Sequence, residues 1–210
     1  NVGEYFDVFR KTPIHDWHVE NKAKFENVGQ WKRAWFYPRK NEGMHEAVQR
    51  ESKAARDSAG ILDASTLGKI DIQGTDASEF LNRVYTNAWS KLAIGKCRYG
   101  LMLNEDGMVY DDGVTTRLDE NHYIMTTTTG GAATVLSKLE DYLQTEWPEL
   151  DVYLTSVTDH YATISVCGPN SKKIISKVIP DIDLSDEKFP HMSFKNTKIG
   201  KVKCRVMRIS

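Results

Sequence analysis

The sequence has little of several residue types, and each shortage excludes a class of protein. Its 210 residues include three widely separated cysteines, without the paired spacing of a zinc site or a disulfide scaffold. No apolar run approaches the roughly 20 residues that a membrane-spanning helix needs. The 28 Lys and Arg nearly balance the 29 Asp and Glu, so the basic surplus of a nucleic-acid-binding protein is missing. We therefore expect a cytoplasmic protein with reduced thiols, no membrane segment and no nucleic-acid partner.

What the chain does contain is enough apolar material to fold. Hydrophobic residues make up 40% of the sequence and aromatic residues 10%, which suits a packed core and argues against wholesale disorder. The length fits one large domain or two small ones. The chain begins at Asn1 rather than Met and stops at Ser210 directly after a strand-like run. We interpret it as a piece of a longer protein, truncated at the C-terminus.

The first 43 residues differ from the rest in their aromatic content and in the lack of a clean period. Three of the five tryptophans and two prolines lie there, at Trp17, Trp31, Trp35, Pro13 and Pro38. We predict an extended arm over residues 1–43, without a regular helix or strand, whose rings lie along another surface. This surface is either the chain's own core or a partner, and clustered tryptophans favour an interface.

From residue 44 the spacing of apolar residues alternates between helix-like and strand-like. Gly60 is the expected C-cap of the first helix, and Thr75 the start of a capping box for the second. Residues 104–107, Asn-Glu-Asp-Gly, predict a hairpin turn. Helices are predicted over residues 44–59, 75–87, 132–147 and 170–178, and strands over residues 67–73, 99–103, 108–118, 122–127, 152–156, 161–166 and 201–210. This order predicts an α+β domain of antiparallel sheets with packed helices over residues 44–210.

Two adjacent acids, Asp111 and Asp112, interrupt a strand-like stretch. Side chains alternate along a strand, so one acid should face solvent and the other the interior or a cavity. A carboxylate turned inward costs several kcal/mol unless it is paired, which invites a functional explanation. On the residues alone, an edge strand with Gly113 at a bulge and two solvated acids is the simpler interpretation.

Three other features have a functional and a structural interpretation. His15 and His18 are three residues apart, which suits a metal if the segment is helical, but Pro13 argues against a helix, so we predict surface or interface histidines and no metal. The segment Thr126–Gly131 could hold an anion ahead of a helix, although a plain N-cap is commoner. Cys97 and Cys167 have no histidine in the same motif and are predicted to be core thiols.

Residues 60–118 carry a series of motifs in a fixed order: D-x-S-x-x-G-K, G-x-D-A-x-x-F-L, T-N, G-x-x-x-Y and L-N-x-x-G-x-x-x-D-D. Residues 162–171 add a strand followed by a G-P-x-S turn. In these features the chain resembles the glycine-cleavage T-protein (aminomethyltransferase) family, from about residue 44 to the end. The resemblance implies the N-terminal portion of a T-protein-like, folate-binding fold.

Four stretches, residues 15–39, 95–115, 126–136 and 143–158, narrow the resemblance to the family of α subunits of heterotetrameric sarcosine oxidases. This likeness implies that sarcosine is oxidised at a flavin and that the resulting imine passes to tetrahydrofolate in this domain, giving glycine, methylene-tetrahydrofolate and hydrogen peroxide. The implied cofactor of this region is tetrahydrofolate, with FAD, FMN and NAD elsewhere in the complete enzyme. The implied partners are a flavin-bearing β subunit and γ and δ subunits.

The resemblance also assigns roles to individual residues. Asp112 matches the family's catalytic aspartate, either as a fixed carboxylate beside the folate nitrogens or as a general base, and is taken as the inward acid. Tyr99 and Leu67 match the wall of the pterin pocket, and Thr128 stands where the transferases usually have Asn. The glutamate that grips the pterin would follow Ser210, so we expect the 210-residue piece alone to bind folate weakly or not at all.

Two alternative functions stay open at this stage. One is a stand-alone folate-dependent aminomethyltransferase or demethylase, which would need no flavin subunit. The other is a non-catalytic folate-binding relative, although the K-G-C-Y-x-G-Q-E signature typical of that group does not occur in this sequence.

Overall fold

The computed structural model describes residues 7–209 and divides the chain into two compact units. The first unit comprises Asn1–Thr66 and His160–Lys177, and the second comprises Leu67–Asp159 and Val178–Ser210. The boundary expected between residues 43 and 44 falls inside the first unit. The division of the chain into domains 1–43 and 44–210 stays a prediction.

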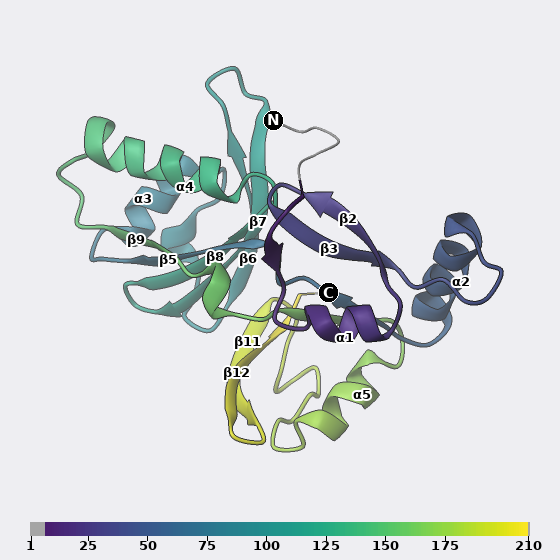
Figure 1. Cartoon of the computed structure of the whole chain (residues 1–210). Coiled ribbons are helices and arrows are strands. Elements are labelled where there is room, and N and C mark those ends of the chain that lie inside the picture. Colours follow the sequence, from purple (N-terminus) through teal and green to yellow (C-terminus); the bar gives the residue numbers. More distant parts are fainter. Residues whose placement is uncertain (1–6, 210) are drawn as a thin grey trace. The chain divides into compact units, whose positions relative to one another are not determined.

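The first unit contains two small sheets. Its elements are, in chain order, β1 (Arg10–Lys11), α1 (His15–Glu20), β2 (Lys24–Val28), β3 (Trp31–Phe36), α2 (Met44–Asp57), β4 (Gly60–Asp63), β10 (Ile164–Cys167) and most of α5 (Ser171–Val178). Figure 1 labels α1, β2, β3, α2 and α5. Strand β3 pairs with β1 in parallel and with β2 antiparallel. Strands β4 and β10, about a hundred residues apart in the chain, form an antiparallel pair.

The expectation that the first 43 residues contain no regular helix or strand is wrong. Strands β2 and β3 form a hairpin whose turn holds Gly29 at φ 57°, in the left-handed region that favours glycine. Pro13 precedes α1 and does not prevent it, because a proline ahead of a helix removes no helical hydrogen bond. Trp31 and Phe36 at the two ends of β3 are both buried, on positions of opposite parity. The alternation that signals a strand is therefore absent from this segment.

The second unit is built on a five-stranded sheet. Its elements are β5 (Gly68–Gln73), α3 (Ala77–Val84), the 3-10 turn η1 (Trp89–Lys91), β6 (Cys97–Leu103), β7 (Val109–Asp119), β8 (His122–Thr127), α4 (Ala132–Asp141), the π-helical turn η2 (Tyr142–Glu146), β9 (Tyr153–Ser156), β11 (Ser193–Ile199) and β12 (Val202–Arg208), with a 3-10 turn η3 (Thr158–His160) at its border. The strand order is β6-β7-β8-β5-β9, with every neighbouring pair antiparallel. The predicted α+β class with antiparallel sheets is confirmed.

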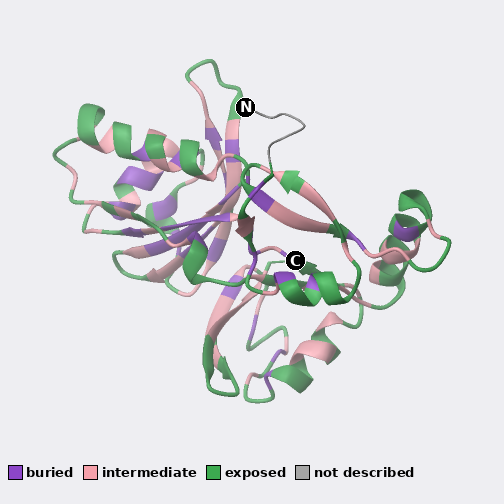
Figure 2. Ribbon diagram, in the orientation of Figure 1, coloured by how far each residue is buried: buried purple, intermediate pink, exposed green. Residues whose placement is uncertain are grey.

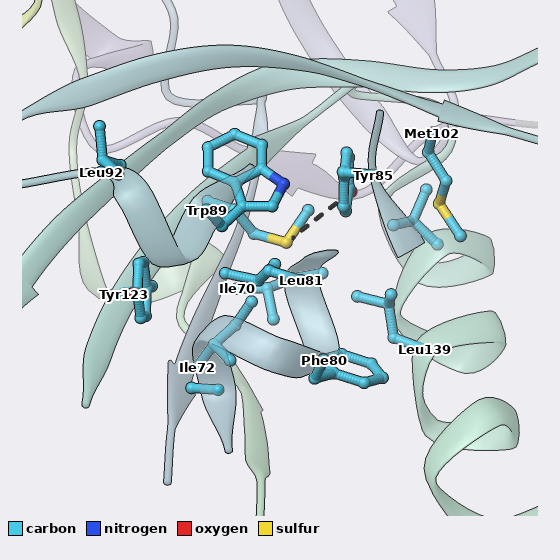
Figure 3. Close-up of a cluster of buried hydrophobic side chains, with 13 residues drawn as sticks. Ile70, Ile72, Phe80, Leu81, Tyr85, Trp89, Leu92, Met102, Tyr123 and Leu139 are labelled. Atoms are coloured by element: carbon cyan, nitrogen blue, oxygen red, sulfur yellow. Dashed lines mark hydrogen bonds between the residues drawn. The ribbon is translucent and has the colours of Figure 1, made fainter. Parts of the chain in front are cut away.

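One face of this sheet packs against α3 and α4 and forms the core of the second unit. In α3 the buried residues follow helical spacing, and Phe80 and Leu81 are fully buried. Burial of one such side chain stabilises the fold by about 1.5–3 kcal/mol. Figure 3 shows Ile70, Ile72 and Met102 of the sheet meeting these helices, and Figure 2 shows the buried strands. We call this side of the sheet the covered face.

Two predicted helix caps are not found, because residues far away in the chain take their place. Helix α2 ends at Asp57, and Gly60 instead begins β4, where it pairs with Cys167. Thr75 does not cap α3, since its N–H and its hydroxyl donate to Asp151 Oδ2 at 3.2 and 2.9 Å. Contacts of this range are invisible to a local pattern.

Candidate functional site

The two adjacent acids of β7 lie on opposite faces of the five-stranded sheet. Asp111 pairs with Met102 of the core, and only 4% of its surface is exposed. Asp112 pairs with Leu101 and is half-buried. The predicted alternation is confirmed, but the inward acid is Asp111 and not Asp112. Which parity faces inward depends on the helices that cover one side of the sheet, and the strand's own sequence does not contain that information.

Asp112 has a partner on its own face of the sheet, which we call the Asp112 face. The hydroxyl of Tyr99 donates to Asp112 Oδ2 at 2.7 Å, and this hydrogen bond raises the pKa of Tyr99. Asn87 Nδ2 donates to the Tyr99 carbonyl oxygen at 2.6 Å and holds the strand at that position. The Tyr99 ring is half exposed, at 50%. The pair therefore presents a fixed carboxylate beside an accessible aromatic ring.

The other two predicted site residues lie at the same end of the sheet. Continuing the register of β7 with β8 brings Asp112 level with Thr128, and continuing that of β8 with β5 brings Leu67 level with Thr128 as well. Leu67 is half-buried and Thr128 is exposed. The backbone N–H of Thr128 donates to Asp111 Oδ1 at 3.1 Å, so this residue is tied to the covered face. Tyr99 and Asp112 thus lie on the neighbouring strands β6 and β7, whereas Thr128 directly follows β8 and Leu67 directly precedes β5.

Asp111 is the buried acid that the sequence could not assign. Burial raises its pKa, and hydrogen bonds from Thr128 lower it only in part. Its Oδ2 is buried and makes no hydrogen bond to any residue that the structure describes. Tyr85, also buried, has its pKa raised by burial and by the charge of Asp111. The surroundings of Asp111 therefore favour the protonated acid.

Lys69 is a residue of the Asp112 face that the sequence analysis passed over. It pairs with Thr126 and is 4% exposed. Its Nζ donates to the carbonyl oxygen of Leu67 at 2.9 Å, so it braces one wall of the predicted pocket. The sequence did contain a signal for Lys69, which is the last residue of the motif D-x-S-x-x-G-K.

The two histidines of α1 are buried, contrary to the surface position predicted for them. His15 and His18 are 8% and 3% exposed. Nε2 of His18 lies 2.8 Å from Asp63 Oδ2, and Nδ1 lies 2.6 Å from the hydroxyl of Tyr37. Burial raises the pKa of Tyr37 to about 12, so its hydroxyl keeps its proton. These contacts join α1 to the end of β4 in a buried polar network.

The two cysteines predicted to be core thiols have different environments. Cys97 is buried, burial raises its pKa, and Thr116 Oγ1 donates to its Sγ at 3.3 Å. Cys167 is exposed, so its assignment to the core is wrong. It lies on β10, in the small β4–β10 sheet, where few neighbours cover it. Neither cysteine forms a disulfide.

The three tryptophans of the N-terminal segment also separate into two groups. Trp31 is 4% exposed, and the guanidinium of Arg10 lies 4.1 Å from the centre of its ring. Trp17 and Trp35 are 53% and 50% exposed. The core and the surface interpretations thus each apply to part of the segment.

Residues 7–209 contain neither a candidate metal site nor a helix that could span a membrane. Within this range no three His, Cys, Asp or Glu side chains lie close enough to hold a metal ion. The helices in the same range are all too short or too polar to cross a membrane.

Comparison with known proteins begins with a family model. The model described as GCVT N-terminal domain matches residues 14–210. The match includes α1, β2 and β3, so most of the aromatic segment belongs to the matched region.

Curated relatives match nearly the whole chain. It is 56% identical over 209 residues to sarcosine oxidase subunit alpha of Corynebacterium sp. strain U-96, covering 99% of this chain and 22% of the relative. It is 48% identical over 200 residues to the same subunit of Rhizobium meliloti strain 1021, covering 95% and 20%. An aminomethyltransferase of Listeria monocytogenes serotype 4a strain HCC23 is 32% identical over 179 residues, covering 85% and 46%. The chain therefore spans only part of each of these relatives.

Solved structures share the fold at low sequence identity. The glycine cleavage system aminomethyltransferase T of Bartonella henselae superposes with a TM-score of 0.74 and 22% identity, over 91% of this chain and 48% of that one. A chain of the heterotetrameric sarcosine oxidase of Corynebacterium sp. U-96, in complex with pyrrole 2-carboxylate, gives a TM-score of 0.52 and 13% identity, over 79% of each chain.

Proposed function

Since this chain belongs to the GCVT N-terminal domain family, we propose that it forms part of a domain that binds tetrahydrofolate and transfers a one-carbon unit to it. The aminomethyltransferases among its relatives support this reaction class. The observation that carries the proposal is the 2.7 Å hydrogen bond between Tyr99 and Asp112 on an accessible face of the sheet. It supplies an oriented carboxylate beside an aromatic ring.

For the whole protein we propose the activity of a sarcosine oxidase α subunit in the cytoplasm. Identities of 56% and 48% to such subunits support this choice over a simple transferase. In this scheme sarcosine is oxidised at a flavin held elsewhere in the enzyme, which also contains NAD. The imine then reaches the domain that contains this chain, and glycine, methylene-tetrahydrofolate and hydrogen peroxide are the products.

The residues of the Asp112 face fit a reduced pteridine. Leu67, Leu101 and Tyr99 offer apolar and aromatic surface, which a flat ring needs, while Asp112 offers the acceptor. Tetrahydrofolate, when bound, supplies the nitrogen atoms that receive the carbon. Asp112 would orient those nitrogens by accepting a hydrogen bond and would favour the positive charge that develops next to them. Tyr99 would hold the carboxylate at a fixed angle, and Lys69 would keep the Leu67 backbone in place.

The test is Asp112→Asn in the full-length protein, assembled with its partner subunits. Asn keeps the shape and can still accept from Tyr99, but it carries no charge, so we expect methylene-tetrahydrofolate yield to fall by about 10²-fold or more. Sarcosine oxidation, followed as hydrogen peroxide release, should be unchanged. The control is Asp106→Asn, which changes an exposed acid in the turn between β6 and β7. An Asp112→Asn enzyme with normal yield would refute the proposal.

The 210-residue chain gives a second test, because we propose that residues of the full-length protein outside it complete the folate site. Calorimetry with tetrahydrofolate should show weak binding or none, since a polar pterin edge would lack its carboxylate partner. Micromolar binding to the piece would show that the missing residues contribute little.

The alternative function is a stand-alone aminomethyltransferase or demethylase, for which the 32% identity to an aminomethyltransferase is the favouring observation. The two proposals differ in the native assembly. Purification of the full-length protein as a flavin-free monomer would favour the alternative, whereas a visible flavin spectrum in a complex would favour sarcosine oxidase. A non-catalytic folate-binding role would leave the Asp112→Asn enzyme without any defect in transfer.

The partners we propose are a flavin-bearing β subunit and γ and δ subunits. Trp17 and Trp35, each about half exposed in the first unit, are proposed to contact the flavin-bearing subunit, because exposed aromatic rings are typical of interface centres. Replacing both with Ala should reduce the copurified flavin-bearing subunit. Tyr153→Ala, an exposed aromatic residue of β9, is the control. Full copurification of the double variant would contradict this surface assignment.

A further inference from the structure

Asp111 is a buried acid to which the proposed one-carbon transfer assigns no role. It lies on the covered face of β7, at 4% exposure, beside Met102 and Tyr85 of the core. Its Oδ1 accepts the Thr128 N–H at 3.1 Å, and its Oδ2 is buried with no hydrogen-bond partner among residues 7–209. A carboxyl group with so few partners destabilises a core relative to an apolar residue. Stability does not explain its presence.

Through its hydrogen bond to Thr128, Asp111 contacts the segment between β8 and α4. The N-cap of α4 is Gly131, which has no side chain with which to cap the helix. The Gly131 N–H bonds instead to the Thr128 carbonyl at 3.2 Å, and Thr128 is held in turn by Asp111. A Cβ added to Gly131 would come 3.7 Å from Asp111 Oδ1, so the carboxyl lies against the start of the helix. Asp111 thus anchors the residue three positions before the N-cap of α4, although no N–H of the helix itself bonds to it.

The same segment borders the proposed folate site. Thr128 continues β8 at the level of Asp112, on the neighbouring strand. The Thr128 N–H is turned toward Asp111, which ties this residue to the covered face. Two successive residues of β7 therefore contribute to the same region. Asp112 lies on the face of the proposed site, and Asp111, on the covered face, binds the neighbouring residue Thr128.

We propose that Asp111 is a positioning residue of the folate site, which fixes the segment Thr128–Gly131 against β7 through the hydrogen bond that it accepts from the Thr128 N–H. The inference rests on the folate site proposed above. The titratable groups that interact with the charge of Asp111 are Tyr85, beyond the end of α3, and, on the opposite face of the sheet, Tyr99 and Asp112; none of them supplies a positive charge. The role depends on the position of the acceptor oxygen beside the Thr128 N–H.

The test compares Asp111→Ala with Asp111→Asn in the full-length protein and its subunits. Asp111→Ala removes the acceptor, and we expect kcat/KM for tetrahydrofolate to fall about tenfold through a higher KM, while hydrogen peroxide release is unchanged. Asp111→Asn retains an acceptor oxygen for the Thr128 N–H and should restore kcat/KM to within about twofold. Thr115→Val, a buried polar residue of β7 away from Thr128, is the control for simple destabilisation.

Amide hydrogen exchange gives a readout that needs no folate. Exchange over residues 128–131 should be about tenfold faster in Asp111→Ala and unchanged in Asp111→Asn. The inference is overturned if Asp111→Ala changes neither exchange nor kcat/KM, if Thr115→Val lowers kcat/KM equally, or if Asn is as damaging as Ala.

The outcomes also separate this inference from the proposed function. A defect in Asp112→Asn without one in Asp111→Ala would overturn the positioning role alone. Normal transfer in Asp112→Asn would overturn the proposed function, and the exchange measurement would still decide whether Asp111 holds the segment.

Discussion

The two compact units each bury an aspartate of the family motifs, and the two acids have opposite properties. Asp63 in the first unit is 7% exposed and Asp111 in the second is 4% exposed. Burial raises the pKa of Asp63, but hydrogen bonds from Ser65 and His18 outweigh it and hold the pKa below its ordinary value. Burial of Asp111 is offset only in part, and its pKa is raised. Similar burial therefore accompanies opposite shifts.

The difference lies in the donors that surround each carboxyl group. Asp63 accepts from the Ser65 N–H at 3.0 Å on one oxygen and lies 2.8 Å from His18 Nε2 with the other. Asp111 has Thr128 on one oxygen and no partner on the other among the described residues. The number of donors, and not the depth of burial, decides which protonation state is favoured. The hydrogen bonds of Asp63 stabilise the first unit. Those of Asp111 do not offset its burial, so a role other than stability is expected for it.

The largest effect we expect comes from Asp63→Ala. It leaves Nε2 of the buried His18 without its partner and should lower the free energy of unfolding by about 1–3 kcal/mol at neutral pH. Because the folded pKa is lowered, the stability that Asp63 contributes is present above its unfolded value of about 3.9 and is lost as pH falls through the folded pKa. Urea unfolding of the 210-residue chain at pH 7 and pH 3 measures both quantities.

Asp57→Ala is the control in the same unit. Asp57 pairs with Lys53 on the surface, where the side chains are 59% and 78% exposed, so the loss should stay below about 1 kcal/mol. A result for Asp63→Ala no larger than this control would contradict the contrast between the two acids.

A smaller effect of opposite sign is expected for Asp111→Asn. The pKa of Asp111 is higher in the folded chain than the unfolded value of about 3.9. Below about pH 3.9 the acid therefore does not lower the free energy of unfolding. It lowers that free energy increasingly as the pH rises through the folded pKa. Asn removes this titration and should make the chain more stable at pH 7 by about 1 kcal/mol. The gain should vanish near pH 3. A loss of stability at pH 7 would mean that Oδ2 has a partner, such as an ordered water, that Asn cannot replace.

Local patterns predicted the helices and strands from β5 to β9 in the second unit well, because their apolar residues repeat at helical or strand spacing, whereas β11 (Ser193–Ile199) was not predicted. The alternation at Asp111 and Asp112 correctly placed the two acids on opposite faces. It could not identify the covered face, since that depends on α3 and α4, which come from other parts of the chain. The resemblance named Asp112, and its role stays a prediction.

The first unit was harder to predict because its order comes from distant pairs. Gly60 looks like a helix cap until it is paired with Cys167, and His18 looks like a surface residue until it meets Asp63. The buried position of His18 involves a contact between residues 45 positions apart. No window of ten or twenty residues contains this information.

The smallest effect on stability is expected for the third acid, Asp112, when its partner is removed by Tyr99→Phe. The Tyr99 ring is 50% exposed, so water replaces the lost hydroxyl and the free energy of unfolding should change by less than about 1 kcal/mol. The proposed site predicts a larger effect on chemistry: an Asp112 carboxylate no longer fixed at 2.7 Å should lower methylene-tetrahydrofolate yield by about fivefold in the assembled enzyme. Tyr153→Phe, on an exposed ring of β9, is the matched control and should change neither quantity. A Tyr99→Phe enzyme with normal yield would show that the half-buried acid needs no positioning partner, and Asp112 would then have to be oriented by the strand alone.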